Sequence, residues 1–216
     1  MDQYLPVVIV IAIMLLVGFP VHEFAHALAA YRLGDGTAKL FGRLSLNPIV
    51  HFDPIGGSLL AITMLLSYGG FGFGWAKPTP VNPMNLEGGR NGEAIVSAAG
   101  PLSNLVLAAA AAIPLRYLHG AETLDVPLLV STLETFIWIN LVLMVFNLIP
   151  IPPLDGSKVM FAFMDRRTAY QVRAVLEQYG LIILIALILP ILPGGSLLGQ
   201  IMRPIINGIY GVLVGV

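Results

Sequence analysis

Residues 5–31 read LPVVIVIAIMLLVGFPVHEFAHALAAY, a long apolar run that contains the pentad H-E-F-A-H. About 20 predominantly apolar residues cross the hydrocarbon core of a bilayer, so this run predicts a membrane-spanning helix. On a helix, positions i and i+4 share one face, and His22 and His26 can therefore direct two imidazoles at one cation. Glu23 lies one position further round, within reach of the proton of a water at that cation. The pattern indicates water chemistry inside an apolar helix.

The composition of the whole chain also indicates a membrane protein. Of its 216 residues, 57% are hydrophobic and 11% are charged, whereas about 25% of the residues of soluble domains are charged. The net charge of −1 argues against a nucleic-acid partner, which needs clustered Lys and Arg. The chain has no cysteine, so a metal would be held by His, Asp or Glu. The first four residues carry no Lys or Arg, so we do not expect a cleaved signal peptide.

Further apolar runs predict an all-α polytopic membrane protein, a bundle of about five or six transmembrane helices. These runs cover residues 94–118, 126–149, 181–192 and 197–216, with a shorter one at 55–68. Between 69 and 83 the chain is too rich in glycine and proline for a helix, which indicates a re-entrant or extended element after the first helix. We expect one membrane-embedded domain over residues 1–216, with a core at 5–160 and C-terminal helices at 168–216.

The basic residues predict the orientation in the membrane. Residues 32–54 carry three Lys or Arg and residues 151–180 carry four, whereas residues 119–125 carry none. The positive-inside rule then places the two basic loops in the cytoplasm and the N-terminus outside. The first and third long spans therefore both run inward, and the pentad and Asp155 emerge on the same side. Residues 55–93 must then begin and end on the cytoplasmic side.

A third metal ligand is expected, because a catalytic zinc has three protein ligands and one open position. Candidates are His51, Asp53, Glu134 and Asp155. Asp155 is favoured because it follows a span that ends at the depth of the pentad, in a turn that prolines and a glycine make rigid. Glu134 lies in mid-span, and His51 and Asp53 come second because they lie on the same side of the membrane. Taken alone, P-P-L-D-G is also an ordinary turn.

Several motifs in order carry a family resemblance. After H-E-F-A-H come G-R-L-S-L-N-P, H-F-D-P-I-G-G, G-W-A-K-P-T-P-V-N-P, A-A-G-P-L-S-N and N-L-I-P-I-P-P-L-D-G, spread over residues 18–158. This set resembles the site-2 protease family of intramembrane zinc metalloproteases, in the compact form without PDZ or CBS domains.

The resemblance implies one Zn²⁺ per chain, with His22, His26 and Asp155 as its ligands and Glu23 as the catalytic acid/base. It also implies roles near the substrate for three further residues, Gly100, Asn104 and Asn147. His51 stays a possible additional metal or site residue. The Asn147 amide can serve as a donor to the developing oxyanion, although Asn147 can equally be a helix-ending residue.

We therefore expect a zinc-dependent endopeptidase that cleaves transmembrane-helix substrates near the cytoplasmic face, as in regulated intramembrane proteolysis. A substrate helix must unwind locally before its peptide bonds are accessible, and residues 69–83 can hold the unwound piece as an added strand or be a plain loop. The expected surroundings are membrane lipid and transmembrane protein or peptide substrates, in a multi-pass protein of a prokaryotic cell membrane.

Two other classes of protein remain as alternatives. One is a metal-binding membrane carrier that uses His22, His26 and Asp155 as a transit site. Carriers usually show internal repeats with matching broken helices, and this chain shows none. The other is a non-catalytic binder of membrane helices. A carrier also has no need for a glutamate beside the first histidine.

Overall fold

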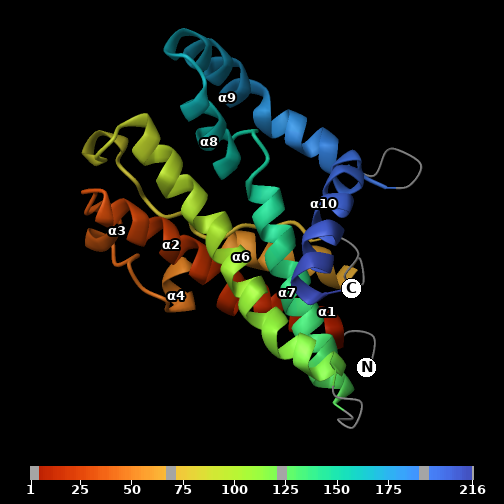
Figure 1. Cartoon of the computed structure of the whole chain (residues 1–216). Coiled ribbons are helices and arrows are strands. Elements are labelled where there is room, and N and C mark those ends of the chain that lie inside the picture. Colours follow the sequence, from red (N-terminus) through yellow and green to blue (C-terminus); the bar gives the residue numbers. More distant parts are fainter. Residues whose placement is uncertain (1–4, 67–71, 121–125, 190–194, 216) are drawn as a thin grey trace.

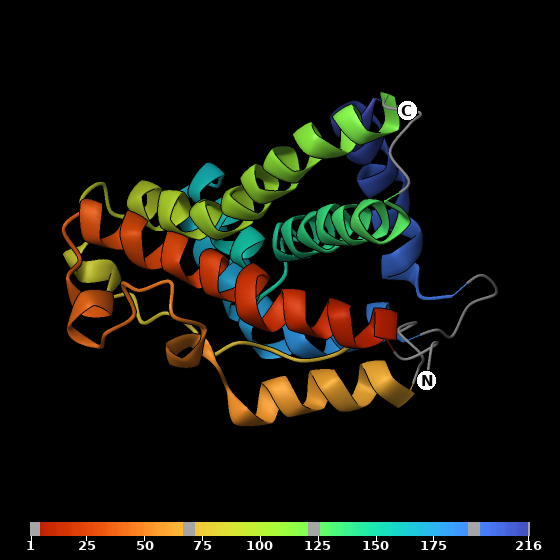
Figure 2. The ribbon, with the colours of Figure 1, turned by 90° about the horizontal axis from the view of Figure 1, so that it is seen from below.

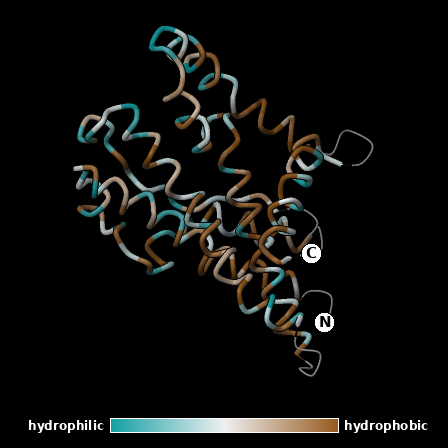
Figure 3. Tube along the Cα trace, viewed as in Figure 1, coloured by the Kyte–Doolittle hydropathy of each residue, from teal (hydrophilic) through white to brown (hydrophobic). Residues whose placement is uncertain are grey.

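The computed structural model describes residues 5–66, 72–120, 126–189 and 195–215. Among these residues, five helical stretches are long and apolar enough to cross a membrane: Val7–Arg32, Arg90–Gly120, Pro127–Asn147, Arg166–Ile188 and Leu197–Val214. Figure 1 shows them as a bundle of inclined helices, and Figure 3 shows hydrophobic residues along most of their length. The prediction of an all-α membrane bundle is confirmed.

The first span is one continuous helix with a change of winding in its middle. It comprises α1 (Leu5–Ile13), a π-helical segment, η1 (Met14–Gly18), and α2 (Phe19–Arg32). Pro20 lies in the first turn of α2. Proline has no backbone N–H to donate to the preceding turn, and its ring clashes with the carbonyl group four residues earlier. The wider π turn accommodates it, and such turns are common beside functional sites. The pentad H-E-F-A-H begins at His22, two residues after Pro20.

Two short helices, α3 (Thr37–Leu40) and α4 (Pro48–His51), lead to α5 (Pro54–Leu66), which is apolar but too short for a full span. Beyond α5 the chain returns in extended form from residue 72 to 82 and ends in η2 (Pro83–Asn85). Figure 2 shows this return beside α5, so the element starts and finishes at the same end of the molecule, as predicted. Residues 69–71 of the predicted element lie outside the described residues.

Glycines allow the extended return to cross α5 at backbone contact. A Cβ on Gly56 would lie 2.2 Å from the carbonyl oxygen of Trp75, and a Cβ on Gly74 would lie 2.3 Å from the carbonyl oxygen of Gly56. Thr63 of α5 accepts a hydrogen bond of 2.9 Å from the amide of Phe73 through its hydroxyl. The extended segment, residues 72–82, is therefore anchored on a helix.

The main core forms where α6 (Arg90–Gly120), α7 (Pro127–Asn147) and α10 (Leu197–Val214) meet. Ala108 and Ala112 of α6 are fully buried, and such small residues let helices approach closely where lipid offers no hydrophobic drive. Residues 121–125 of the connection 119–125, which carries no Lys or Arg, lie outside the described residues.

The helix α8 (Asp155–Phe163) and the long α9 (Arg166–Ile188) follow α7. Hydropathy predicts the fourth span only from residue 181, but α9 begins at Arg166. Asp165 starts it, because Oδ1 of Asp165 accepts hydrogen bonds of 3.0 Å from the amides of Arg167 and Thr168. A capping residue determines where a helix begins, and its apolar part can follow later. In Figure 1 the starts of α6 and α9 lie towards one end of the bundle, with the end of α2.

Candidate metal centre

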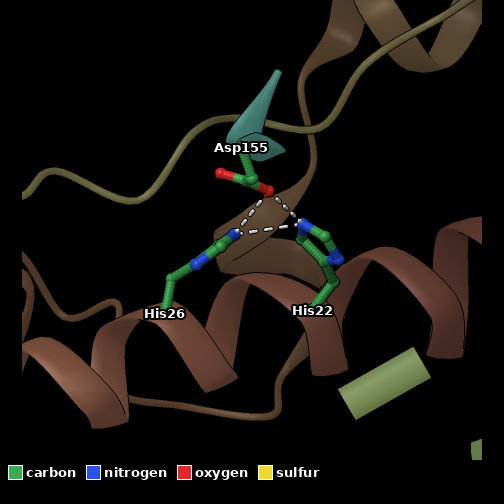
Figure 4. A group of neighbouring side chains, drawn as sticks. All are labelled: His22, His26 and Asp155. Atoms are coloured by element: carbon green, nitrogen blue, oxygen red, sulfur yellow. Dashed lines mark hydrogen bonds and ion pairs between the residues drawn. The ribbon is translucent and has the colours of Figure 1, made fainter. Parts of the chain in front are cut away.

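Three side chains from two distant parts of the chain meet at one point. His22 and His26 lie one turn apart on α2, and Asp155 is the first residue of α8. Nε2 of His22 lies 3.0 Å from Nε2 of His26, and each Nε2 lies 3.2 Å from Oδ2 of Asp155. Figure 4 shows the two rings converging on one carboxylate oxygen. Among the described residues, these three form the one group that is suited to hold a metal ion.

The spacing of these atoms fits a tetrahedral zinc ion. Zinc binds imidazole nitrogen and carboxylate oxygen at about 2.0–2.2 Å, so tetrahedral ligand atoms lie about 3.3–3.6 Å apart. The observed separations of 3.0 and 3.2 Å are close to this value. Two histidines and one carboxylate also make up a common ligand set of catalytic zinc sites.

Hydrogen bonds on the far side of both rings fix their orientation. Nδ1 of His26 donates to the carbonyl oxygen of Val96 at 2.7 Å, and Nδ1 of His22 donates to Oδ1 of Asn104 at 2.7 Å. A proton on Nδ1 leaves Nε2 with a free lone pair, as metal-binding histidines need. Two nitrogen lone pairs and one carboxylate oxygen then converge on one point, an arrangement that a cation satisfies.

Asn104 links His22 to the middle of the bundle. Its Nδ2 donates to Oδ1 of Asn140 on α7 at 2.9 Å and lies 3.4 Å from the carbonyl oxygen of Gly18. Both asparagines are fully buried, and a buried polar group is stable only when its hydrogen bonds are made. This network sets the direction of the Asn104 carbonyl oxygen, which accepts from His22.

Gly100 leaves room beside the ligand atoms. It lies one turn before Asn104 on α6, and a Cβ there would lie 2.4 Å from Nε2 of His26 and 2.6 Å from Nε2 of His22. Both distances are far shorter than any van der Waals contact. Any other residue at position 100 would push the two imidazoles away, so the glycine is part of the site.

Close backbone packing also places Asp155. A Cβ on Gly156 would lie 2.1 Å from the carbonyl oxygen of Leu148, so this glycine lets α8 start directly against the end of α7. Burial raises the pKa of the Asp155 carboxyl, but the hydrogen bonds and charges of His22 and His26 lower this pKa by a larger amount. The net pKa lies well below its usual range, and the carboxylate is ionised at neutral pH.

Glu23 lies beside the metal group and is held by the extended segment. Its Oε2 accepts a hydrogen bond of 2.7 Å from the amide of Thr79, and its carbonyl oxygen accepts one of 3.0 Å from the Thr79 hydroxyl. Glu23 and Thr79 line a cavity of about 390 Å³ together with the metal group. The carboxylate therefore faces the space in which a substrate would react.

The other predicted candidates lie elsewhere or have other partners. His51 is buried, with Nε2 bonded to the carbonyl oxygen of Ser45 at 2.7 Å. Oδ1 of Asp53 accepts from the amides that begin α5. Glu134 lies 3.5 Å from Nε2 of His119. Of the four candidates for the third ligand, the structure brings Asp155 alone to the histidine pair among the described residues.

Asn147, the last residue of α7, lines the cavity at the metal group. Its Nδ2 donates to the carbonyl oxygen of Leu143 in the same helix at 2.9 Å. Its second N–H and its Oδ1 are not needed for that bond. The structure is therefore compatible with both roles that the sequence left open, a helix-ending residue and a donor to the reacting carbonyl.

Thr79 was not singled out from the sequence, although a signal was present. It stands between two prolines in P-T-P, and proline has no N–H. The Thr79 amide is therefore an isolated backbone donor, which no regular secondary structure can use and which Glu23 accepts. Val96 also escaped notice, because it contributes a backbone carbonyl that any residue could supply.

Comparison with known proteins gives matches over most of the chain. The model of the peptidase family M50 matches residues 113–191. A Bacillus subtilis protein named "Putative zinc metalloprotease YwhC" is 39% identical over 201 residues, which cover 91% of this chain and 85% of that protein. "Putative zinc metalloprotease Rip2" of Mycolicibacterium smegmatis is 31% identical over 188 residues, which cover 87% and 69% of the two chains. No solved structure matches the chain.

Proposed function

We propose that this chain cleaves transmembrane-helix substrates within the membrane. The proposal starts from the fact that the chain belongs to peptidase family M50, the site-2 protease family of zinc metalloproteases. The step would serve regulated intramembrane proteolysis. The observation that carries the proposal is the convergence of His22, His26 and Asp155 beside Glu23, in a protein with five apolar helices.

Each residue of the site has a role in this proposal. His22, His26 and Asp155 hold the zinc ion, and the atoms behind the rings keep both Nε2 atoms directed at it. Zinc, when bound, lowers the pKa of a water to about 7 and polarises a carbonyl. Glu23 accepts a proton from the attacking water and passes it to the leaving amine. Asn147 donates to the carbonyl oxygen as negative charge develops there.

The extended segment, residues 72–82, suits a substrate that has been unwound. An unwound piece of substrate helix has free backbone groups, and pairing them with an extended neighbour restores their hydrogen bonds. The segment runs to Thr79, whose amide already contacts Glu23. A substrate strand that pairs with it would thus lie next to the catalytic carboxylate.

A larger apolar cavity of about 630 Å³ supports an approach from the lipid. It lies between the first span, α5, α7 and α10, and its lining includes Met14, Leu60, Trp138 and Gly72. Gly72 is the first described residue of the extended segment. A substrate helix seated here would have its unwound end close to that segment.

The basic loops support placing the site near the cytoplasmic face. Residues 32–54 and 151–180 carry seven of the eleven Lys and Arg residues. These segments include the end of α2 and the first part of α9, and the positive-inside rule places such basic segments on the cytoplasmic side. His22 and His26 lie in the second half of the first span, towards its end at Arg32, and Asp155 is the first residue of α8, which follows α7. Water would then need to cross only a short part of the bilayer to reach it.

The test is proteolysis by the full chain, purified and reconstituted in lipid with a model transmembrane substrate. We expect cleavage that a chelator abolishes and added zinc restores. Glu23→Gln should retain the metal and lose cleavage, which also separates a protease from a metal carrier. Cleavage that survives chelation, or that His22→Ala leaves unchanged, would refute the assignment.

A further inference from the structure

A second polar cavity, of about 580 Å³, lies at the end of the molecule where α6 and α9 begin. Its lining includes three arginines, Arg90 from α6 and Arg166 and Arg173 from α9. Among the described residues that line it, none is acidic. The cavity is separate from the metal centre and shares no lining residue with it. Three guanidinium groups around one hollow favour an anionic ligand.

Arg90 is held in a fixed position at this cavity. Its Nη2 donates to the carbonyl oxygens of Ala162 and Met164 at the end of α8, at 3.2 and 2.5 Å. A guanidinium has five N–H donors, so most of the group remains available to a ligand. The contact with α8 therefore fixes the Arg90 side chain before a ligand binds, so that binding does not have to restrict its conformation.

Arg173 lies two turns after Arg166 on the same face of α9. Its guanidinium lies 4.9 Å above the ring of Phe161 and 3.5 Å from Oε2 of Glu93. A second carboxylate, Glu177, lies 3.8 Å from its Nε. These carboxylates hold Arg173 from outside the cavity, because neither of them lines it.

Arg166, like Arg90, has no carboxylate partner among the described residues. Within the part of the chain that the structure describes, its side chain has no hydrogen bond or ion pair, and it is exposed. The nearby Asp165 uses its carboxylate to cap α9. The cavity thus keeps a net positive charge.

The surroundings place this cavity at the surface of the bilayer. The two helices that border it are both candidate spans, and they begin at Arg90 and Arg166. Tyr170 lines the cavity and is 79% exposed, and Phe163, at the end of α8, is 88% exposed. Aromatic residues gather at the headgroup level of membranes. Figure 3 likewise shows hydrophilic residues at the turn between α8 and α9, above the apolar part of α9.

We propose that this cavity binds the phosphate group of an anionic phospholipid, one per chain. The planar fork of arginine matches two phosphate oxygens at once, and basic pockets between transmembrane helices bind acidic lipid headgroups. A soluble phosphate ester offers the same oxygens. The lipid is favoured because the exposed ring of Tyr170, which lines the cavity, provides an apolar contact for its glycerol and chains, which a soluble ion does not use.

The experiment compares two neighbouring arginines in the full-length protein. Arg166 lines the cavity and Arg167 does not, so Arg166→Ala and Arg167→Ala remove the same charge from adjacent positions. Binding of phosphatidylglycerol and of phosphatidylcholine is measured by native mass spectrometry, with thermal unfolding as a check on folding. We expect wild type and Arg167→Ala to retain one phosphatidylglycerol and to prefer it over phosphatidylcholine. Arg166→Ala should weaken this binding about tenfold or more, the usual loss for one charge-assisted hydrogen bond.

Several results would overturn the proposal. Equal weakening in both variants would indicate general surface attraction, and unchanged binding in Arg166→Ala would show that the cavity is not the site. Equal binding of the two lipids would remove the role of charge. In a separate arm, inorganic phosphate replaces the lipid. If phosphate alone stabilises wild type as much as phosphatidylglycerol does, and Arg166→Ala removes this stabilisation, the ligand is a soluble anion and the lipid assignment is wrong.

Discussion

The backbone amide of Thr79 donates a hydrogen bond of 2.7 Å to Oε2 of Glu23, across 56 positions of sequence. The two residues come from different parts of the fold, the first span and the extended return after α5. This bond orients the carboxylate beside the metal group, and the flanking prolines prevent the amide from bonding within a regular element. The segment that we propose to hold substrate therefore also positions Glu23, the residue that we propose as the catalytic acid/base.

Thr79→Pro should impair catalysis by removing this amide. A hydrogen bond to a charged group contributes about 1.5–3 kcal/mol, so we expect kcat to fall about tenfold to a hundredfold while zinc stays bound. Thr79→Val is the matched control, because it removes the hydroxyl bond to the Glu23 carbonyl and keeps the amide. Steady-state cleavage of a model substrate measures both. Equal losses in the two variants would contradict a special role for the amide.

Gly100→Ala should abolish zinc binding, because its Cβ would lie 2.4 Å from Nε2 of His26. The Cβ itself has no torsional freedom, so the imidazoles of His22 and His26 would have to rotate away from the point at which their Nε2 atoms meet. Gly208→Ala on α10 is the control, because a Cβ there has nothing within 4 Å. Zinc content after dialysis checks the pair. A Gly100→Ala protein with wild-type zinc content would show that the ligands lie elsewhere.

Asn104→Ala should weaken zinc binding without removing a ligand. Loss of a group that orients a metal-binding histidine typically costs about tenfold to a hundredfold in metal affinity. Ser103→Ala, at the adjacent position, removes only a bond to the carbonyl oxygen of Gly100 and should bind zinc normally. A competition titration with a zinc chelator gives both affinities. The role of Asn104 would be disproved if the two variants bound zinc alike.

Asp35 should make stability depend on pH in acid. Burial raises the pKa of the Asp35 carboxyl, but hydrogen bonds from Thr37, Asn82 and Asn85 lower this pKa by a larger amount. The net pKa lies below the ordinary value of about 3.9. A carboxyl whose pKa is lower in the folded than in the unfolded protein stabilises the fold when the pH is above its unfolded pKa. That stabilisation is lost as the pH falls through the folded pKa.

Asp35→Asn should therefore lower the Tm at pH 7, with a cost of about 1–3 kcal/mol for the unsatisfied donors. The difference from wild type should shrink below about pH 4. Asp53→Asn is the control, because Asp53 accepts hydrogen bonds from the amides at the start of α5 and asparagine caps a helix as well as aspartate does. Thermal unfolding from pH 7 to pH 3 measures all three proteins, and a difference that does not change with pH would argue against this account.

Local rules and long-range contacts differed in how well the sequence could predict them. The shared face of His22 and His26 follows from helix geometry alone. The approach of Asp155 required an argument about which spans run in the same direction, and the structure brings these side chains together. Their assignment as zinc ligands stays a prediction until the metal is measured.

Contacts that depend on packing could not be predicted in the same way. Gly100 and Asn104 were named only through the family resemblance, because their partners lie on another helix about 80 positions away. The start of α9 at Arg166 escaped the hydropathy reading, since a cap and not an apolar run begins that helix. The bond between Glu23 and Thr79 joins a side chain to a backbone group, and residue types carry little information on such pairs.

The central claim is that His22, His26 and Asp155 together hold one zinc ion that Glu23 does not ligate. Its most direct test is the zinc content per chain of wild type, Asp155→Ala and Glu23→Gln, measured by elemental mass spectrometry after dialysis against a weak chelator. The account predicts one zinc in wild type and Glu23→Gln, and little or none in Asp155→Ala. One tightly held zinc in Asp155→Ala, with undiminished proteolysis, would contradict it.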